Sequence, residues 1–232
     1  VPVGLACGIV GVIIGVLSLT GAATSFAGVV LKVGDTSVFL SLVLTMLVCL
    51  VLGMGIPTIP NYIITSSIAA PALLKLGVPL LVSHMFVFYF GIMADLTPPV
   101  ALAAFAAASI AKASPMKIGF KATQIAIAGF VIPFMAVYDN ALMLQGDWTF
   151  SAVAYVVFKC LLSIVLWGGV VVGHLYGDLT KAQRVGCALA AAMLVSAMPL
   201  TDEIGFGMTA AMAAWMLITG RRLAAASNSV AG

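Results

Sequence analysis

The sequence predicts an all-α integral membrane protein, and three observations lead to this fold class. Hydrophobic residues make up 63% of the 232 positions, whereas roughly 45–50% is usual in soluble domains. Charged residues make up 7%, against about 25% on average. A soluble fold of this length could not cover its surface with 10 basic and 7 acidic side chains. The charge-free runs are also long enough for helices that cross a bilayer.

The charge balance and the absence of reaction motifs exclude several classes of protein. A net charge of +3 is too small and too scattered for a nucleic-acid-binding surface. The composition also excludes a cytosolic enzyme and a disordered segment. The sequence contains no nucleophile elbow, zinc-protease motif or nucleotide-binding loop. We therefore expect no enzyme activity and no cofactor.

The first predicted span covers residues 1–31, which carry no charge. That is enough for one long or tilted helix, since about 20 apolar residues cross the hydrocarbon core. A short polar loop with Lys32 and Asp35 follows. The chain starts at Val1 within apolar sequence, without an initiator Met or a basic leader. We expect it to be a piece of a longer polypeptide.

The second predicted element, residues 36–75, is a helical hairpin. Its uncharged part, residues 36–74, would be about 58 Å long as one helix, nearly twice the roughly 30 Å of hydrocarbon. The string GMGIPTIPN, residues 53–61, contains two glycines and two prolines, which interrupt a helix. Each arm is then short for a full crossing, which favours a re-entrant hairpin. The loop charges leave two full spans open as the alternative.

The third predicted element, residues 79–111, is a broken transmembrane helix. Its middle reads DLTPPV, residues 95–100, and two consecutive prolines remove two donors and free the carbonyls of the preceding turn. Non-helical backbone persists at membrane depth only where protein or a water-filled cavity satisfies it. Two interrupted apolar segments close in sequence point to a transporter site.

Plainer spans follow. The span over 122–138 completes a predicted transport repeat, residues 1–138. Additional transmembrane helices occupy 148–220, as spans over 149–177, 185–200 and 204–220, and a polar tail covers 221–232. Lys159 interrupts one of these spans, and we expect its ammonium group to snorkel to the interface. For His84 a structural hydrogen bond is favoured over a proton relay.

Loop charges give the predicted orientation. If the spans alternate, one side of the membrane collects seven basic residues: Lys112, Lys117, Lys121, Lys181, Arg184, Arg221 and Arg222. The other side collects Lys32 and Lys75, together with acidic loops that hold Asp139, Asp147, Asp202 and Glu203. By the positive-inside rule the first side is the cytoplasm.

The two interruptions carry the candidate chemistry. Broken helices leave carbonyl ends that coordinate a hard cation and N–H ends that hold an anion. A sodium ion could bind the backbone carbonyls of Gly53 and Gly55 and the hydroxyls of Thr58 and Thr97. Thr97 could instead only satisfy a freed carbonyl. Asp95, an acidic residue well inside an apolar segment, could bind a cation, carry a proton, cap a half-helix or pair with a lysine elsewhere.

The strings LTMLVCLVLGMG, GMGIPTIPN, TPPVALAA and KATQIAIAGFVIPFMAVYDNALML closely resemble the large permease subunit of tripartite ATP-independent periplasmic (TRAP) transporters. The fused TAXI type is the most similar. This resemblance implies a fold of two inverted repeats, each with one re-entrant hairpin and one broken helix. The chain then corresponds to the C-terminal repeat, and its partners are the N-terminal repeat and the small-subunit helices of the same permease.

The resemblance also implies a function. Members import organic acids such as dicarboxylates across the bacterial or archaeal cytoplasmic membrane as multi-pass proteins. A periplasmic substrate-binding protein delivers the solute, an ion gradient, usually of sodium, drives import, and an elevator-type motion carries the site. The candidate ion- and substrate-binding residues are Gly53, Met54, Gly55, Pro57, Thr58, Asn61, Asp95, Thr97, Pro98 and Pro99.

Other functions remain as alternatives. The carrier could be coupled to protons instead of sodium, with Asp95 as the coupling group. The chain could be a structural or assembly domain, or a channel. An intramembrane enzyme based on Asp95 would need a second acid or nucleophile as its partner, and the sequence offers none. The transported solute and the oligomeric state are not readable from the sequence.

Overall fold

A computed structural model describes residue 8 and residues 11–13, 15–17, 19–127, 129–175, 177–195 and 199–230. The side chains of residues 22, 23, 199 and 219–230 are outside this description. The regular elements in the described ranges are helices, and one isolated bridge pairs His174 with Asp178. The chain divides into two compact units: residues 1–126 with 143–146, and residues 127–142 with 147–232.

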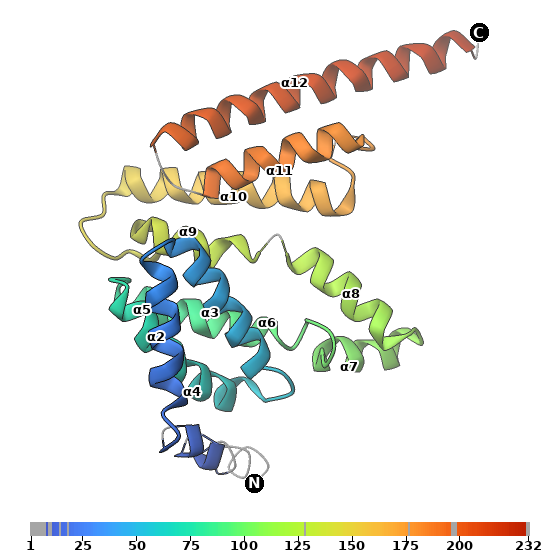
Figure 1. The fold of residues 1–232 in the computed structure, drawn as a ribbon. Coiled ribbons are helices and arrows are strands. Elements are labelled where there is room, and N and C mark those ends of the chain that lie inside the picture. The colour runs from blue at the N-terminus through green and yellow to red at the C-terminus, as the bar shows by residue number, and fades with distance from the viewer. Residues whose placement is uncertain are drawn as a thin grey trace. The chain divides into compact units, whose positions relative to one another are not determined.

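Unit 1 is built around the helix that precedes the predicted break. Its elements are α2 (Ala22–Gly34), α3 (Val38–Leu52), α4 (Thr58–Ile68), α5 (Ala70–Lys75), α6 (Leu80–Met93), α7 (Leu102–Ala111) and α8 (Pro115–Ala126). Helix α6 packs against both α3 and α4, while α2 packs against α3, α4 and α5. Helices α7 and α8 pack against each other (Figure 1).

The turn between α3 and α4 is shorter than the sequence indicates. Helix α3 begins after Ser37, whose hydroxyl accepts from the Leu40 amide, and ends at Gly53. Helix α4 already begins at Thr58, so Pro60 and Asn61 lie within its first turn. A proline is tolerated there because the amides of a first turn have no intrahelical partner. The turn therefore covers residues 53–57 instead of 53–61, and we refer to it as the hairpin tip.

Two predicted spans are interrupted in the structure. The expectation of one helix over residues 1–31 is wrong at Gly21, which adopts a left-handed φ of 68° immediately before α2 begins. Residues 1–7, 9–10, 14 and 18 of that span lie outside the described residues. The predicted span over 122–138 is also divided, since α8 ends at Ala126 and α9 (Val131–Tyr138) begins after it. The boundary between the units falls there, before the predicted repeat end at 138.

Unit 2 contains the later helices. After α9 come the short 3₁₀ turn η1 (Asn140–Met143), whose last residue is assigned to unit 1, and then α10 (Phe150–Val172), α11 (Lys181–Val195) and α12 (Pro199–Val230). Helix α11 packs against both α10 and α12. The core of this packing consists of Leu166, Leu179, Cys187, Ala190, Ala191, Leu194 and Met216. Small residues on α11 allow its two neighbours to approach closely.

The end of the chain corrects two expectations. Asp202 and Glu203, placed in a loop by the sequence interpretation, lie in the first turns of α12. The residues predicted as a polar tail, 221–232, continue the helix as far as Val230. The last two residues lie outside the described part of the chain.

Helix lengths bear on the membrane assignment. Among the described residues, two stretches are long and apolar enough to cross a membrane: Pro115–Tyr138, which comprises α8, α9 and the interruption between them, and Phe150–Val172. Helices α3, α6 and α7 are apolar but shorter. The 15 residues of α3 extend about 22 Å, which is less than the roughly 30 Å hydrocarbon thickness.

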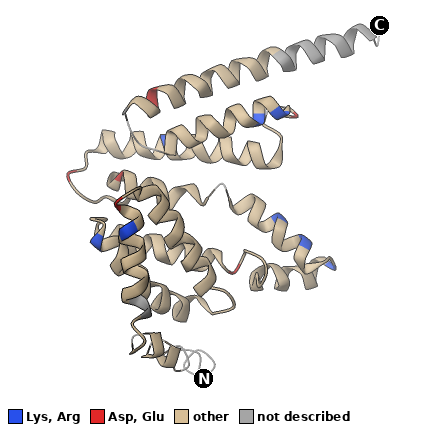
Figure 2. Ribbon diagram, in the orientation of Figure 1, with Lys and Arg blue, Asp and Glu red and all other residues tan. Residues whose placement is uncertain are grey.

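Within each unit, the charged residues fall into two groups at opposite ends. In unit 1, Figure 2 shows the lysines of α2 and α5 on one side and those near the α7–α8 turn on the other. In unit 2, the helix order places Lys181 and Arg184 at the α10–α11 end, and Asp147 and Asp202 at the opposite end of α10. Within each unit, the charges that the alternating spans assign to opposite sides of the membrane therefore lie at opposite ends.

Candidate functional site

The hairpin tip lies against the end of α6, and a glycine makes the close approach possible. Gly53 caps the C-terminus of α3. A Cβ atom at this position would lie 2.6 Å from the Gly91 carbonyl oxygen and 2.8 Å from the Ala94 Cβ. Any larger residue would push α3 away from α6. The glycine is therefore required for packing as well as for the turn.

Asn61 fills the space that two glycines leave open. It is 1% exposed, and its Nδ2 donates to the Gly91 carbonyl oxygen at 2.6 Å. A Cβ on Gly91 would lie 2.8 Å from the Asn61 Oδ1, and a Cβ on Gly53 would lie 2.8 Å from its Nδ2. The Oδ1 atom is buried without a hydrogen-bond partner among the described residues. The amide thus joins α4 to α6 and keeps one acceptor unused.

The chain between α6 and α7, residues 94–101, is non-helical, and we refer to it as the break. The pair of prolines predicts an interruption at this place. The Pro98–Pro99 bond is cis, and Ala101 has a left-handed φ of 41°. The Ala103 amide donates to the Asp95 carbonyl oxygen at 3.1 Å, which ties the start of α7 to the beginning of the break.

Helix α8 supports the break through two residues that sequence reasoning missed. The Thr123 hydroxyl donates to the Leu96 carbonyl oxygen at 3.1 Å. Gly119, one turn earlier on the same face, lies so close to the break that a Cβ there would be 3.2 Å from the Pro98 ring. A small residue and a hydroxyl at i and i+4 in an apolar helix are the signal that could have found them.

The tip and the break are in contact. Gly55 has a φ of 75°, a conformation that favours glycine. A Cβ on Gly55 would lie 3.4 Å from a methyl group of Val100. Together with the approach of Gly53 to Ala94, this forms a junction between the two interruptions.

The remaining candidate residues differ in their surroundings. Asp95 is half-buried, and its Oδ1 is buried without a hydrogen-bond partner among the described residues. The Thr97 hydroxyl donates to the Met93 carbonyl oxygen at 2.5 Å, so it satisfies a carbonyl freed by the break. Its oxygen lone pairs stay available for a cation. Met54 and Pro98 are half-buried, whereas Pro57, Thr58 and Pro99 are exposed.

His84 has the structural hydrogen bond that the sequence favoured. Its Nδ1 and the Tyr62 hydroxyl are 2.8 Å apart, which links α6 to α4. The Tyr62 ring also meets the Phe88 ring edge to face. The two helices that flank the tip and the break are therefore joined by a polar contact as well as by Asn61.

Lys159 corrects another expectation, because it does not snorkel. It is 1% exposed, and its ammonium lies 2.9 Å and 3.3 Å from the two carboxylate oxygens of Asp202. The Tyr155 hydroxyl donates to the same carboxylate at 3.0 Å. The sequence interpretation treated Asp202 as a loop charge, so it missed the partner that neutralises Lys159 within unit 2.

Comparison with known proteins agrees with the resemblance noted in the sequence. A family model described as "Tripartite ATP-independent periplasmic transporter, DctM component" matches residues 1–149. This range includes the hairpin, the break and α8. The searches of curated proteins and of solved structures each returned no match. Transport, a membrane location and a periplasmic binding protein as partner follow from the family, which is a family of transporters and not of enzymes. The chain belongs to the DctM family, the large permease component of TRAP transporters.

Proposed function

We propose that the tip–break junction is one half of the transport site of an ion-driven importer of organic acids. The observation that carries this proposal is the close approach of the two helix interruptions. A Cβ on Gly53 would lie 2.8 Å from the Ala94 Cβ, and a Cβ on Gly55 would lie 3.4 Å from a Val100 methyl group. Two side-chain oxygens have no hydrogen-bond partner among the described residues: Asn61 Oδ1, in the first turn of α4 after the tip, and Asp95 Oδ1, in the break. Polar atoms of this kind are expensive in an apolar setting unless a ligand uses them.

The junction suits a hard cation such as sodium. Its available groups are oxygens: the carbonyls of Gly53 and Gly55, the hydroxyls of Thr58 and Thr97, and the side chains of Asn61 and Asp95. Unwound carbonyls and half-helix ends coordinate the coupling ion in transporters with broken helices. The Thr97 hydroxyl donates its proton to Met93, so its lone pairs can face a cation.

The same junction provides positive helix ends for a carboxylate substrate. Helix α4 begins at Thr58 and α7 begins at Leu102, each directly after an interruption. The positive dipole ends of such helices favour an anion. The substrate would be an organic acid, with dicarboxylates as the proposed class. The N-terminal repeat and the small-subunit helices would complete its binding site. The TAXI-type fusion remains part of this proposal.

Cation binding would couple the two gradients. An ion that bridges the tip and the break holds α3, α4 and α6 in one arrangement, which orders the helix ends for the carboxylate. By linkage, the substrate then raises the affinity for the ion by the same factor. The short α3 and α4 support a re-entrant hairpin over two full spans. In an elevator-type motion this hairpin would move with the bound ion across the cytoplasmic membrane, as part of a multi-pass protein.

Proton coupling is the second candidate, and Asp95 favours it. A carboxylate with one buried oxygen that has no hydrogen-bond partner among the described residues can carry a proton between the two sides. In this version Asp95 alternates between a neutral and a charged form, and the carbonyls of the tip have a structural role.

Uptake by reconstituted permease tests the proposal. The full-length permease and its cognate binding protein are studied in liposomes with a panel of dicarboxylates, under a sodium gradient or a pH gradient but never both. Uptake that needs sodium and the binding protein is expected. Uptake driven only by the pH gradient would move the coupling role to Asp95. If folded permease gives no uptake under either gradient, the assembly-domain interpretation replaces the importer. Conductance without saturable uptake would indicate a channel.

A further inference from the structure

In unit 2, α10 and α12 meet at one end and separate at the other. At the first end, Lys159 pairs with Asp202, and Phe158 stacks on Phe206 with ring centroids 6.2 Å apart. Farther along, both helices pack against α11. Gly186 of α11 lies so close to α12 that a Cβ there would be 2.5 Å from the Met212 sulfur. The flanking helices thus leave a space between them towards the end of α10.

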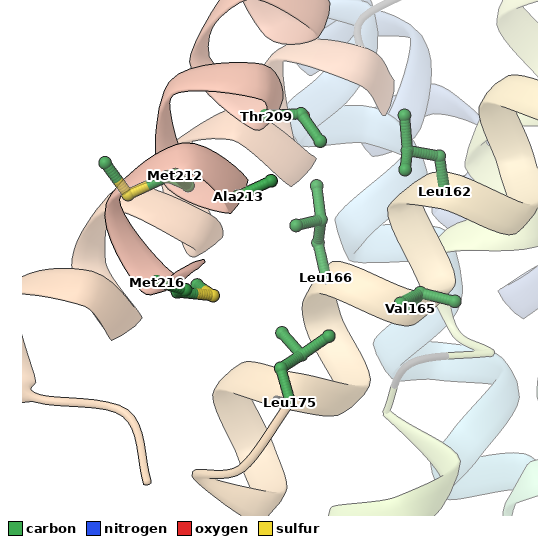
Figure 3. A pocket seen from close by; sticks show the side chains of 8 residues that line it. All are labelled: Leu162, Val165, Leu166, Leu175, Thr209, Met212, Ala213 and Met216. Atoms are coloured by element: carbon green, nitrogen blue, oxygen red, sulfur yellow. The ribbon is translucent and has the colours of Figure 1, made fainter. Parts of the chain in front are cut away.

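This space is an apolar crevice of about 160 Å³. Figure 3 shows the side chains that line it, which come from α10, from the segment just after it and from α12. They are Leu162, Val165, Leu166, Leu175, Thr209, Met212, Ala213 and Met216. Thr209 turns its hydroxyl to the Gly205 carbonyl oxygen at 2.7 Å, so the crevice presents almost only carbon and sulfur atoms.

Basic side chains lie at the same end of the unit as the crevice. Leu175, which lines the crevice, lies two residues after Gly173, the C-cap of α10. A Cβ on Gly173 would collide with the guanidinium of Arg184, so this exposed cation lies against the end of α10. Lys181 is exposed one turn earlier on α11. The nearby Asp178 carboxylate pairs with His174 at 3.1 Å.

We propose that this crevice binds one acyl chain of an anionic phospholipid whose headgroup phosphate contacts Arg184 and Lys181. The argument is charge complementarity next to an apolar space. A guanidinium favours phosphate oxygens, which it can bind in a bidentate manner. The charge pattern assigns this end to the cytoplasm, and the cytoplasmic surface of a membrane is negatively charged.

The volume fits part of an acyl chain. An apolar cavity of about 150 Å³ stays dry and accepts benzene, so the crevice has room for a similar number of methylene carbons. Thioether side chains such as Met212 and Met216 adapt to an irregular hydrocarbon. The proposal does not depend on which ion drives transport, because the crevice is built by unit 2 alone.

Lipid titration of the full-length permease tests the proposal. The permease is purified in detergent, stripped of lipid and titrated with phosphatidylglycerol or with phosphatidylcholine of the same chain length, and bound lipid is counted by native mass spectrometry. We expect saturable binding with a preference for phosphatidylglycerol. Ala213→Phe fills the crevice and should weaken the binding of both lipids at least tenfold. Ala211→Phe, at an exposed position of α12 outside the lining, is the matched control and should bind like the unchanged protein.

A second variant tests the charge separately. Arg184→Gln changes an exposed side chain and should weaken phosphatidylglycerol binding about fivefold, the effect of one basic residue at a membrane surface. Phosphatidylcholine also carries a phosphate, but its choline ammonium cancels the net charge, so its binding should weaken less and the preference for phosphatidylglycerol should fall. Arg184→Gln stays informative if Ala213→Phe fails to fold. Equal effects of Ala213→Phe and Ala211→Phe, or an unchanged preference in Arg184→Gln, would overturn the proposal. An absence of saturable binding to the unchanged protein would also overturn it and would indicate that protein covers the crevice.

Discussion

Asn61 shows how much of the candidate site depends on the absence of side chains elsewhere. Its amide is held between Gly53 and Gly91, and its Nδ2 donates to Gly91. Neither glycine has a side chain, and this allows the Asn61 amide to reach the Gly91 carbonyl oxygen, which also accepts from the Ala94 amide at 3.3 Å. Removing the amide therefore loses one hydrogen bond between α4 and α6, at a cost of about 0.5–1.5 kcal/mol.

The first prediction concerns this arrangement. Gly91→Ala should lower the free energy of unfolding, since its Cβ would lie 2.8 Å from the Asn61 Oδ1. Asn61→Ala should lower it by about 0.5–1.5 kcal/mol through the lost hydrogen bond. The double variant should lose less than the sum, because the two positions share one contact. Thermal unfolding of the purified permease measures this. Gly28→Ala, at an exposed site with nothing within 4 Å, is the control. If the losses of the two single variants simply add in the double variant, the close packing of Asn61 against Gly91 is contradicted.

Substitutions of Thr97 can show whether its hydroxyl binds the coupling cation or only forms a structural hydrogen bond. If its oxygen binds the coupling ion, Thr97→Ala should raise the sodium concentration at half-maximal uptake, whereas Thr97→Ser should keep it. Both variants retain the turn that the prolines define. Sodium titration of uptake in liposomes is the measurement. An unchanged titration midpoint in Thr97→Ala would leave only the bond to the Met93 carbonyl as its role.

At the scale of elements, unit 2 depends on one buried ion pair. Lys159 on α10 and Asp202 on α12 are in direct contact, with Tyr155 as an additional donor. A charge without a partner inside a membrane is expensive. The Asp202 carboxylate on α12 neutralises the Lys159 ammonium on α10, and the reverse also holds. The pair therefore ties α12 to α10, in addition to the packing of both helices against α11.

A charge-removal cycle tests this interpretation. Lys159→Met should destabilise the permease by about 3–5 kcal/mol, because it leaves the Asp202 carboxylate buried without its cation. Lys159→Met combined with Asp202→Asn should recover most of that loss. Glu203→Gln, at the exposed neighbouring position, serves as the control for Asp202→Asn. Denaturant unfolding in detergent gives the values. A double variant no more stable than Lys159→Met alone would refute the pairing.

At the scale of the whole molecule, the charges predict an orientation. Lys32 and Lys75 should face the periplasm, and Lys117 and Lys181 the cytoplasm. In a background without native cysteines, Lys75→Cys should react with a membrane-impermeant maleimide applied to intact cells. Lys117→Cys should react only after the membrane is opened. The same labelling of both positions in intact cells would contradict the alternation of spans.

Much of the site could be predicted because backbone chemistry determined it. The two glycines and Pro57 of the tip and the two prolines of the break disfavour a continuous helix, and the structure interrupts the helices at both places. Gly119 and Thr123 could not be predicted in the same way, since their roles depend on α8 lying against the break. Lys159 was misjudged for a similar reason, because its partner is 43 residues away in sequence.

By itself the sequence determined the membrane class, the family and the positions of the two interruptions. Each of these follows from composition or from local backbone constraints, which act over a few residues. Only the tertiary structure decided that the tip and the break touch, that Asn61 is held between two glycines and that Lys159 is neutralised within unit 2. These features depend on contacts between helices far apart in the chain. Such contacts are fixed by packing and by the partners that buried polar groups require.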